Sequence, residues 1–370
     1  MSNLLDAYID PPLHRACMKG NMELAMALVD GGADVDARNV CQMTPLHYAC
    51  HNGHMEVAMA LVDRGADVDA VDGDQRTPLL FACVNGRNEV ALALISRGAN
   101  VHATEGAVDE DEWDGDEDED TRPRQGTPAH YASVWGLLEV VMSLMDHGAN
   151  INAEDEFQMT PLHYACINGL MEVAMALVDR GADVYARDED QRTPLHVACY
   201  EGHMELAMAL VDRGADVDAE DEDQRTPLHW ACGNGHMEVA IALVKKGANV
   251  FVVNMHGNKP QCTPAMIDLF NRLWYTTPLM KAMLDRDIDR FEALLNDESV
   301  DVNADIGDGY GWTVLHAAVD MHLGECVTRL LRHDRMDTSA KHERRSQTAL
   351  QVACSKGDVA MIRLFYFHVP

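Results

Sequence analysis

The sequence predicts an all-α fold, a solenoid of about ten helix-turn-helix units separated by hairpin loops. Three observations carry this prediction. The tetrapeptide Thr44-Pro45-Leu46-His47 returns at steps of 33 residues, and glycine follows the apolar stretches where helices would end. In addition, 47% of the 370 residues are hydrophobic, which supplies enough apolar surface for a core and excludes a fully disordered chain.

Each unit is expected to contain two helices and a loop. Threonine caps helix amino termini and proline fits the first helical position, so a first helix should follow Thr44. Gly53 stands where a left-handed residue ends that helix. A second helix is expected over about 55–63, closed by Gly65, and the Asp- and Gly-rich stretch 66–77 predicts an extended turn. Neither helix could bury its apolar face alone, so the units must stack.

The repeated motif Thr-Pro-Leu-His-x-Ala at period 33 resembles the ankyrin repeat over roughly residues 11–370. Besides Thr44, strong copies begin at Pro11, Thr77, Thr127, Thr160, Thr193 and Thr226, and looser copies at Thr277, Thr313 and Thr348. The resemblance implies a right-angled helix pair per repeat and hairpins folded outward. It also implies that the repeated histidine binds loop backbone, and that partners contact the hairpin tips and the exposed side of the first helix.

Two departures from the usual ankyrin pattern recur along the chain. The hairpin glycine two places before threonine is replaced by glutamine at Gln42, Gln75, Gln125, Gln158, Gln191 and Gln224. The second alanine of the first helix is replaced by cysteine, which we expect to behave as a small buried hydrophobe, at Cys17, Cys50, Cys83, Cys166, Cys199, Cys232 and Cys354.

Interruptions of the period define the expected domain organisation. Residues 1–10 form a lead-in, and 11–249 form an array of seven repeats with an acidic loop insertion at 105–121. Residues 250–276 form an irregular junction or degenerate repeat, with an expected helix after Thr263, and 277–370 form a carboxy-terminal array of about three repeats.

The insertion has eleven acidic residues and no basic one between residues 105 and 120. Its candidate functional residues are Asp109, Glu110, Asp111, Glu112, Trp113 and Asp114. One interpretation is a solvated spacer, and another is an attractor for a basic peptide. The alternative function for the chain is an acidic chaperone-like or cation-binding module acting through this loop.

Charge restricts the classes of partner. The 61 acidic and 29 basic residues give a formal net charge of −32, which disfavours nucleic acid and anionic membrane surfaces and permits a basic protein partner. The sequence has neither an apolar run long enough to span a membrane nor a signal-like start at residues 1–10. We therefore expect a monomeric protein in the cytoplasm or nucleus.

The sequence lacks the motifs of common catalytic sites. It has no Gly-x-Ser-x-Gly elbow, no phosphate-binding glycine loop and no His-Glu-x-x-His zinc motif. The recurring His-x-x-Cys pair, as in His47 and Cys50, offers two ligands per unit where structural zinc needs four. We expect no enzyme activity, no cofactor and no metal.

Residues that differ between otherwise similar units are the best guide to a binding surface. The candidate partner-binding residues are Trp135, Phe157, Met159, Asp190, Arg192, Tyr200, Asp223 and Arg225. Aromatic residues and Met are enriched at protein interfaces. The sequence therefore predicts a non-catalytic interaction scaffold. The resemblance also implies that hairpin asparagines such as Asn152 and Asn303 can be hydroxylated, although most copies here carry Asp.

Overall fold

The computed structural model describes residues 11–106, 123–250, 252, 254–256, 258, 260, 277–284, 286–304, 312–342 and 347–368. The chain divides into two compact units, Met1–Ala215 and Asp216–Pro370. Their described residues contain ten helix pairs, which confirms the expected repeat number.

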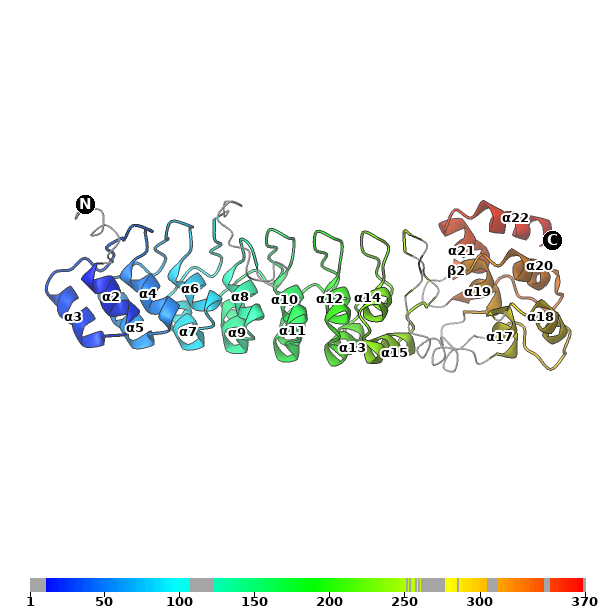
Figure 1. The fold of residues 1–370 in the computed structure, drawn as a ribbon, viewed down its shortest axis with the longest axis horizontal. Helices are drawn as coiled ribbons and strands as arrows, with labels where there is room; N and C mark the ends of the chain where they lie inside the picture. The colour runs from blue at the N-terminus through cyan, green and yellow to red at the C-terminus, as the bar shows by residue number, and fades with distance from the viewer. Residues whose placement is uncertain are drawn as a thin grey trace. The chain divides into compact units, whose positions relative to one another are not determined.

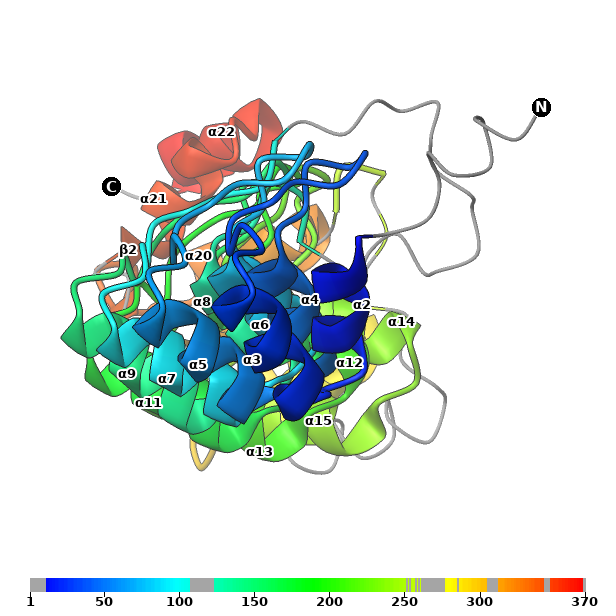
Figure 2. The same ribbon diagram turned by 90° about the vertical axis from the view of Figure 1, so that its left-hand side faces the viewer.

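The first unit is a stack of six helix pairs. First helices pack against first helices and second helices against second helices, and the hairpins project from one side of the stack (Figures 1 and 2). The first helices are α2 (Pro12–Met18), α4 (Pro45–Asn52), α6 (Pro78–Val84), α8 (Pro128–Val134), α10 (Pro161–Ile167) and α12 (Pro194–Glu201). The second helices are α3 (Met22–Asp30), α5 (Met55–Asp63), α7 (Asn88–Ser96), α9 (Leu138–Asp146), α11 (Met171–Asp179) and α13 (Met204–Asp212).

The first helices begin as the sequence predicts. Thr44 has an extended backbone before α4, proline follows it, and the helix ends at Gly53 with a left-handed φ of 78°. The cap differs in one detail, because the Thr44 backbone N–H donates to Nδ1 of His47 at 3.0 Å. The repeated histidine therefore completes the helix start.

Small and medium side chains make up most of the core of the first unit, and the rings of Phe81, Tyr131 and Tyr164 are buried beside them. Leu46, Ala49 and Cys50 of α4 and Ala58 and Leu61 of α5 are fully buried. The equivalent cysteines in the other repeats of this unit are also buried, and burial raises the pKa of the Cys17 and Cys83 thiols to about 12. These thiols act as packing groups.

The second unit contains four helix pairs and a two-stranded ribbon. Its helices are α14 (Pro227–Gly233), α15 (Met237–Lys245), α17 (Pro278–Leu284), α18 (Ile288–Leu295), α19 (Val314–Asp320), α20 (Gly324–Arg332), α21 (Ala349–Ser355) and α22 (Val359–His368). Strands β1 (Lys341–His342) and β2 (Gln347–Thr348) pair antiparallel, with Lys341 opposite Thr348.

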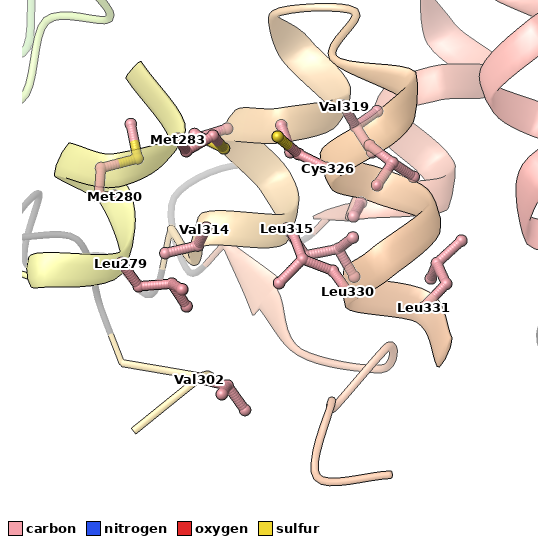
Figure 3. Packing of buried hydrophobic residues seen from close by; sticks show 14 of the residues in the cluster. Leu279, Met280, Met283, Val302, Val314, Leu315, Val319, Cys326, Leu330 and Leu331 are labelled. Carbon is pink, nitrogen blue, oxygen red and sulfur yellow. The ribbon is translucent and has the colours of Figure 1, made fainter. Parts of the chain in front are cut away.

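Larger side chains fill the core of the second unit. Figure 3 shows α17, α19 and α20 packing together, with Met283 facing Cys326 and Leu315 beside Leu330. Phe291 of α18 and Trp312, just before α19, belong to the same cluster. The expectation that every cysteine of the first-helix series is buried is wrong for Cys354, which is exposed on α21. Helix α21 is the last first helix of the described chain, so no following first helix packs against it.

Two further sequence expectations concern membrane-spanning helices and the junction at 250–276. Among the described residues, no helix is both long enough and apolar enough to cross a bilayer. The helix expected after Thr263 in the junction lies outside the described residues.

Candidate functional site

We call the surface made by the hairpins and the carboxyl ends of the first helices of the first unit the hairpin face. Three hairpins of the first unit are held by an aspartate at the base, Asp72, Asp155 or Asp188, and the first hairpin is held in the same way by Asn39. Asp72 N–H donates to the Arg76 carbonyl at 3.0 Å, and the Asp72 carboxylate accepts the N–H groups of Asp74 (3.0 Å) and Arg76 (2.8 Å). This arrangement fixes the loop conformation from within.

The glutamine in each hairpin has a left-handed backbone. The six φ angles lie between 54° and 64°, a region in which a side chain costs about 1–2 kcal/mol relative to the right-handed region. The six residues are Gln42, Gln75, Gln125, Gln158, Gln191 and Gln224. The hairpins keep the geometry that glycine usually provides.

Backbone hydrogen bonds join neighbouring hairpin tips along the first unit. Gly73 N–H donates to the Cys41 carbonyl at 3.0 Å, and Gly106 N–H donates to the Asp74 carbonyl at 2.7 Å. Further along, Glu156 N–H donates to Arg124 and Glu189 N–H to Phe157, both at 3.0 Å. The tips therefore form a continuous row in fixed register.

The repeated histidines tie first helices to the next hairpin, except in α6, where Leu80 stands at this position. Nδ1 of His163 accepts the Thr160 N–H at 3.1 Å, so the proton lies on Nε2, which donates to the Arg192 carbonyl at 3.2 Å. Burial lowers the pKa of His130 and His163 to about 4, so both are neutral at physiological pH. The predicted loop-bracing role is confirmed, and because both ring nitrogens are engaged, these histidines are not arranged as ligands.

Buried aspartates at the hairpin bases have two kinds of partner. Asp188 is paired with the Arg192 guanidinium at 2.8 Å, as Asp72 is with Arg76 at 2.9 Å. Asp155 faces a methionine at the equivalent position and instead accepts a hydrogen bond from the Tyr164 hydroxyl at 2.6 Å. Burial raises the pKa of both Asp155 and Asp188.

Two candidate residues are exposed aromatics at the ends of first helices. Trp135, at the end of α8, is 54% exposed, and Tyr200, on α12, is 43% exposed. Their equivalents in neighbouring repeats are smaller or polar, for example Asn168 and Ile167. These two side chains give the hairpin face its large apolar contacts.

The Trp135 indole also has a structural role. Its Nε1 donates to the Val84 carbonyl of the preceding repeat at 2.7 Å. In other repeat steps a histidine after the turn binds the equivalent carbonyl, as His203 does with Ile167 at 3.1 Å. The equivalent residue here, Leu137, has no side-chain hydrogen-bond donor. The Trp135 indole N–H supplies the missing hydrogen bond to the Val84 carbonyl, and its ring remains half exposed.

The remaining candidates in the first unit differ in accessibility. Phe157 is half-buried, with the Arg124 guanidinium 5.2 Å from its ring centroid. Asp190 and Arg192 lie at a hairpin tip and pair at 3.2 Å. Met159 is only 6% exposed, so the expectation that it presents a surface anchor is wrong; its side chain packs inward at the base of the hairpin.

The other two candidates, Asp223 and Arg225, belong to the second unit. Their side chains pair at 2.8 Å, and the Arg225 guanidinium lies 5.1 Å from the Trp230 ring centroid. They repeat, within their own unit, the tip chemistry of Asp190 and Arg192.

The base of the acidic insertion is fixed by one tyrosine. The Tyr131 hydroxyl hydrogen-bonds the Glu105 carboxylate and lies 3.0 Å from the Pro123 carbonyl. Glu105 is the first residue of the insertion and Pro123 lies just after it, so both ends meet at α8. The candidate residues Asp109, Glu110, Asp111, Glu112, Trp113 and Asp114 lie outside the described residues.

Sequence comparison supports the same assignment as the geometry. A family model of ankyrin repeats in three copies matches residues 13–105, 114–188, 186–254 and 256–342. The chain belongs to the ankyrin repeat family. The crystal structure of the human ASB11 ankyrin repeat domain is similar to this ankyrin protein, with 27% identity and a TM-score of 0.54, over 64% of this chain and 97% of that one. The comparison with curated proteins returns no match.

Membership of this family gives the functional class. Ankyrin repeats are generally protein–protein interaction modules and are typically non-catalytic. In the first unit, the hairpin face combines two exposed aromatic side chains, Trp135 and Tyr200, with a polar rim held by hydrogen bonds.

Proposed function

We propose that this ankyrin protein is a non-catalytic scaffold that binds a partner protein on its hairpin face. The observation that carries the proposal is the exposure of Trp135 and Tyr200 on the first helices of a stack whose other surface positions are mostly polar. Large aromatic side chains anchor interfaces because they bury much area at little entropic cost.

The charge around these aromatics favours a basic partner. Glu156 and Glu189 are exposed at hairpin tips, and residues 1–215 contain 38 acidic and 13 basic side chains. Such a surface raises the association rate of positively charged partners, and the effect weakens as salt screens the charges.

Free thiols support a reducing location. No disulfide joins any two of the nine cysteines that the structure describes, and disulfides are rare in the cytoplasm and nucleus. We propose that the ankyrin protein acts there as a monomer.

The experiment that tests the proposal is affinity purification with quantitative mass spectrometry, using the full chain and a double variant, Trp135→Asn with Tyr200→Val. Both substitutions copy residues that the equivalent positions hold in other repeats, such as Asn168 and Val84, so the stack is expected to fold. Loss of two aromatic anchors should weaken partner recovery about tenfold or more.

Tyr185→Ala is the matched control. Tyr185 is 56% exposed in the same unit but lies in the loop after a second helix, with its hydroxyl donating to the Gly214 carbonyl at 2.8 Å. Partners should be retained by this variant. Equal loss from both variants, or from neither, would contradict binding at the hairpin face.

A further inference from the structure

The hairpin glutamines hold an unfavourable backbone conformation that glycine would adopt freely. Within the described residues, eight non-glycine residues have positive φ, and six of them are these glutamines. Left-handed conformations of residues with side chains are uncommon, and they persist where the side chain or its position has a role.

The glutamine side chains do not offset this strain inside the protein. In the part of the chain that the structure describes, none of the six side-chain amides has a hydrogen-bond partner. Five are exposed, and the sixth, Gln125, is half-buried. The arginines and aspartates beside them, by contrast, are engaged within the hairpins, as Arg192 is with Asp188.

In the first unit these amides lie in one row. Each amide belongs to a residue that directly follows a hairpin tip: Gln42, Gln75, Gln125, Gln158 and Gln191. Backbone hydrogen bonds join neighbouring tips, such as the one from the Gly73 N–H to the Cys41 carbonyl. Stacked helices place neighbouring repeats about 8–10 Å apart, so the amides recur at about that interval.

The chemistry of the row matches an extended polypeptide. A glutamine amide has a donor and an acceptor, which are complementary to the C=O and N–H of a peptide group. An extended chain in the polyproline II conformation has three residues per turn and rises about 3.1 Å per residue, so every third residue presents the same side at intervals of about 9 Å, close to one repeat interval. An α-helix uses its backbone groups internally and offers the row few of them.

We infer that the glutamine row binds an extended segment of the partner through its main-chain peptide groups, at one position in every three residues. The exposed carboxylates of Glu156 and Glu189 beside the row favour lysine or arginine side chains in that segment. The inference rests on the proposed function, because it specifies the partner segment that the hairpin face takes.

The test uses a phage library of unstructured peptides of about 15 residues, enough to span five glutamines at three residues per repeat. The library is panned on the full chain, and the dissociation constants of enriched peptides are measured by fluorescence anisotropy. The key variant replaces all five glutamines of the first unit by glycine. Glycine removes the amide and relieves the strain, so this variant should melt at a higher Tm and bind about tenfold more weakly or worse.

Arg286→Gly is the matched control. Arg286 has the same left-handed conformation, with φ 54°, and is exposed in the second unit. This substitution should raise Tm without changing peptide affinity. A second arm replaces backbone N–H groups of the best peptide by N-methyl groups, one position at a time, and affinity should fall at every third position.

Four results would overturn the inference. Affinity of the five-glycine variant within about twofold of the native chain overturns the inference, as does a lower Tm, which would assign the glutamines a structural role. Enriched peptides that depend on Trp135 and Tyr200 but not on the glutamines overturn the inference and leave the proposed function standing. If the native chain enriches no peptide, the inference fails, and the affinity purification decides the proposed function separately.

Discussion

The first unit and the carboxy-terminal helices of the second unit use the same fold with different means of stabilisation. In the first unit one set of contacts recurs, with histidines such as His163 bracing the next hairpin and small residues such as Cys166 filling the core. In the second unit, individual large residues such as Phe291 form the core, and one arginine, Arg335, donates to four backbone carbonyls after α18 at 2.9–3.3 Å.

This difference predicts which changes destabilise each unit most. A condition that affects the repeated histidine acts at once on five of the six repeats of the first unit, because only the repeat with Leu80 lacks it. A single substitution in a large-residue core acts most strongly on the second unit. The charge differs in the same way, since residues 216–370 contain 23 acidic and 16 basic side chains and are much closer to neutral than the first unit.

Acid should have the largest effect and should act on the first unit. The pKa of His130 and His163 is lowered to about 4 in the fold, so the stability they contribute is complete above the unfolded value of about 6.5. It is lost as pH falls from about 6.5 to 4, by up to about 3 kcal/mol per histidine. Burial raises the pKa of Asp155 and Asp188, so protonation of these two carboxylates favours the folded state as pH falls. Their protonation therefore offsets part of the stability that the histidines lose at low pH.

Urea denaturation of the full chain at pH 7.0, 5.5 and 4.5, followed by hydrogen exchange, measures this loss for each unit. The free energy of unfolding of the first unit should fall stepwise with pH. His163→Leu copies Leu80 of another repeat and should reduce the acid sensitivity, since one titrating group is gone. Stability independent of pH over this interval would contradict the account.

Phe291→Ala should have the largest effect of any single substitution on the second unit. Phe291 is fully buried, and removing a buried phenylalanine side chain costs about 3–5 kcal/mol. Hydrogen exchange should then show faster opening of α18 to α20, with protection of the first unit unchanged. An equal loss of protection in both units would break the distinction between them.

The charged ladder on the second helices should contribute less. Arg180 pairs with Asp146 and Arg97 with Asp63, both at 2.6 Å, each arginine joining one repeat to the preceding one. Because the pairs are partly exposed, Arg180→Ala should cost about 0.2–1 kcal/mol, and the cost should shrink at high salt. Thermal denaturation at low and high ionic strength measures it, and a cost that persists in high salt would point to packing by the arginine stem.

Removal of the acidic insertion should have the smallest effect on binding. Both ends of the insertion meet at Tyr131, so deletion of residues 107–122 with a short glycine linker leaves the hairpin face in place. The main partner should be recovered within about twofold of the native amount, apart from a reduced association rate at low salt. Loss of that partner would favour the alternative function, a chaperone-like or cation-binding role for the insertion.

The repeat period predicted most of the fold, because each helix start, turn and buried cysteine follows from a residue that returns at a fixed step. It also located the glutamines at the hairpin glycine position. Period alone could not show that Met159 turns inward, since arginines at the equivalent positions lie partly at the surface. Nor could it show that the Trp135 indole replaces a histidine bond, because that depends on the donor missing at Leu137.

The most direct test of the central claim is hydrogen exchange of the full chain with and without the partner recovered by affinity purification. If the partner binds the hairpin face, protection should rise in the hairpins and first-helix ends between residues 123 and 201, with the second helices α9, α11 and α13 unchanged. Protection centred on those second helices, or confined to the second unit, would contradict it.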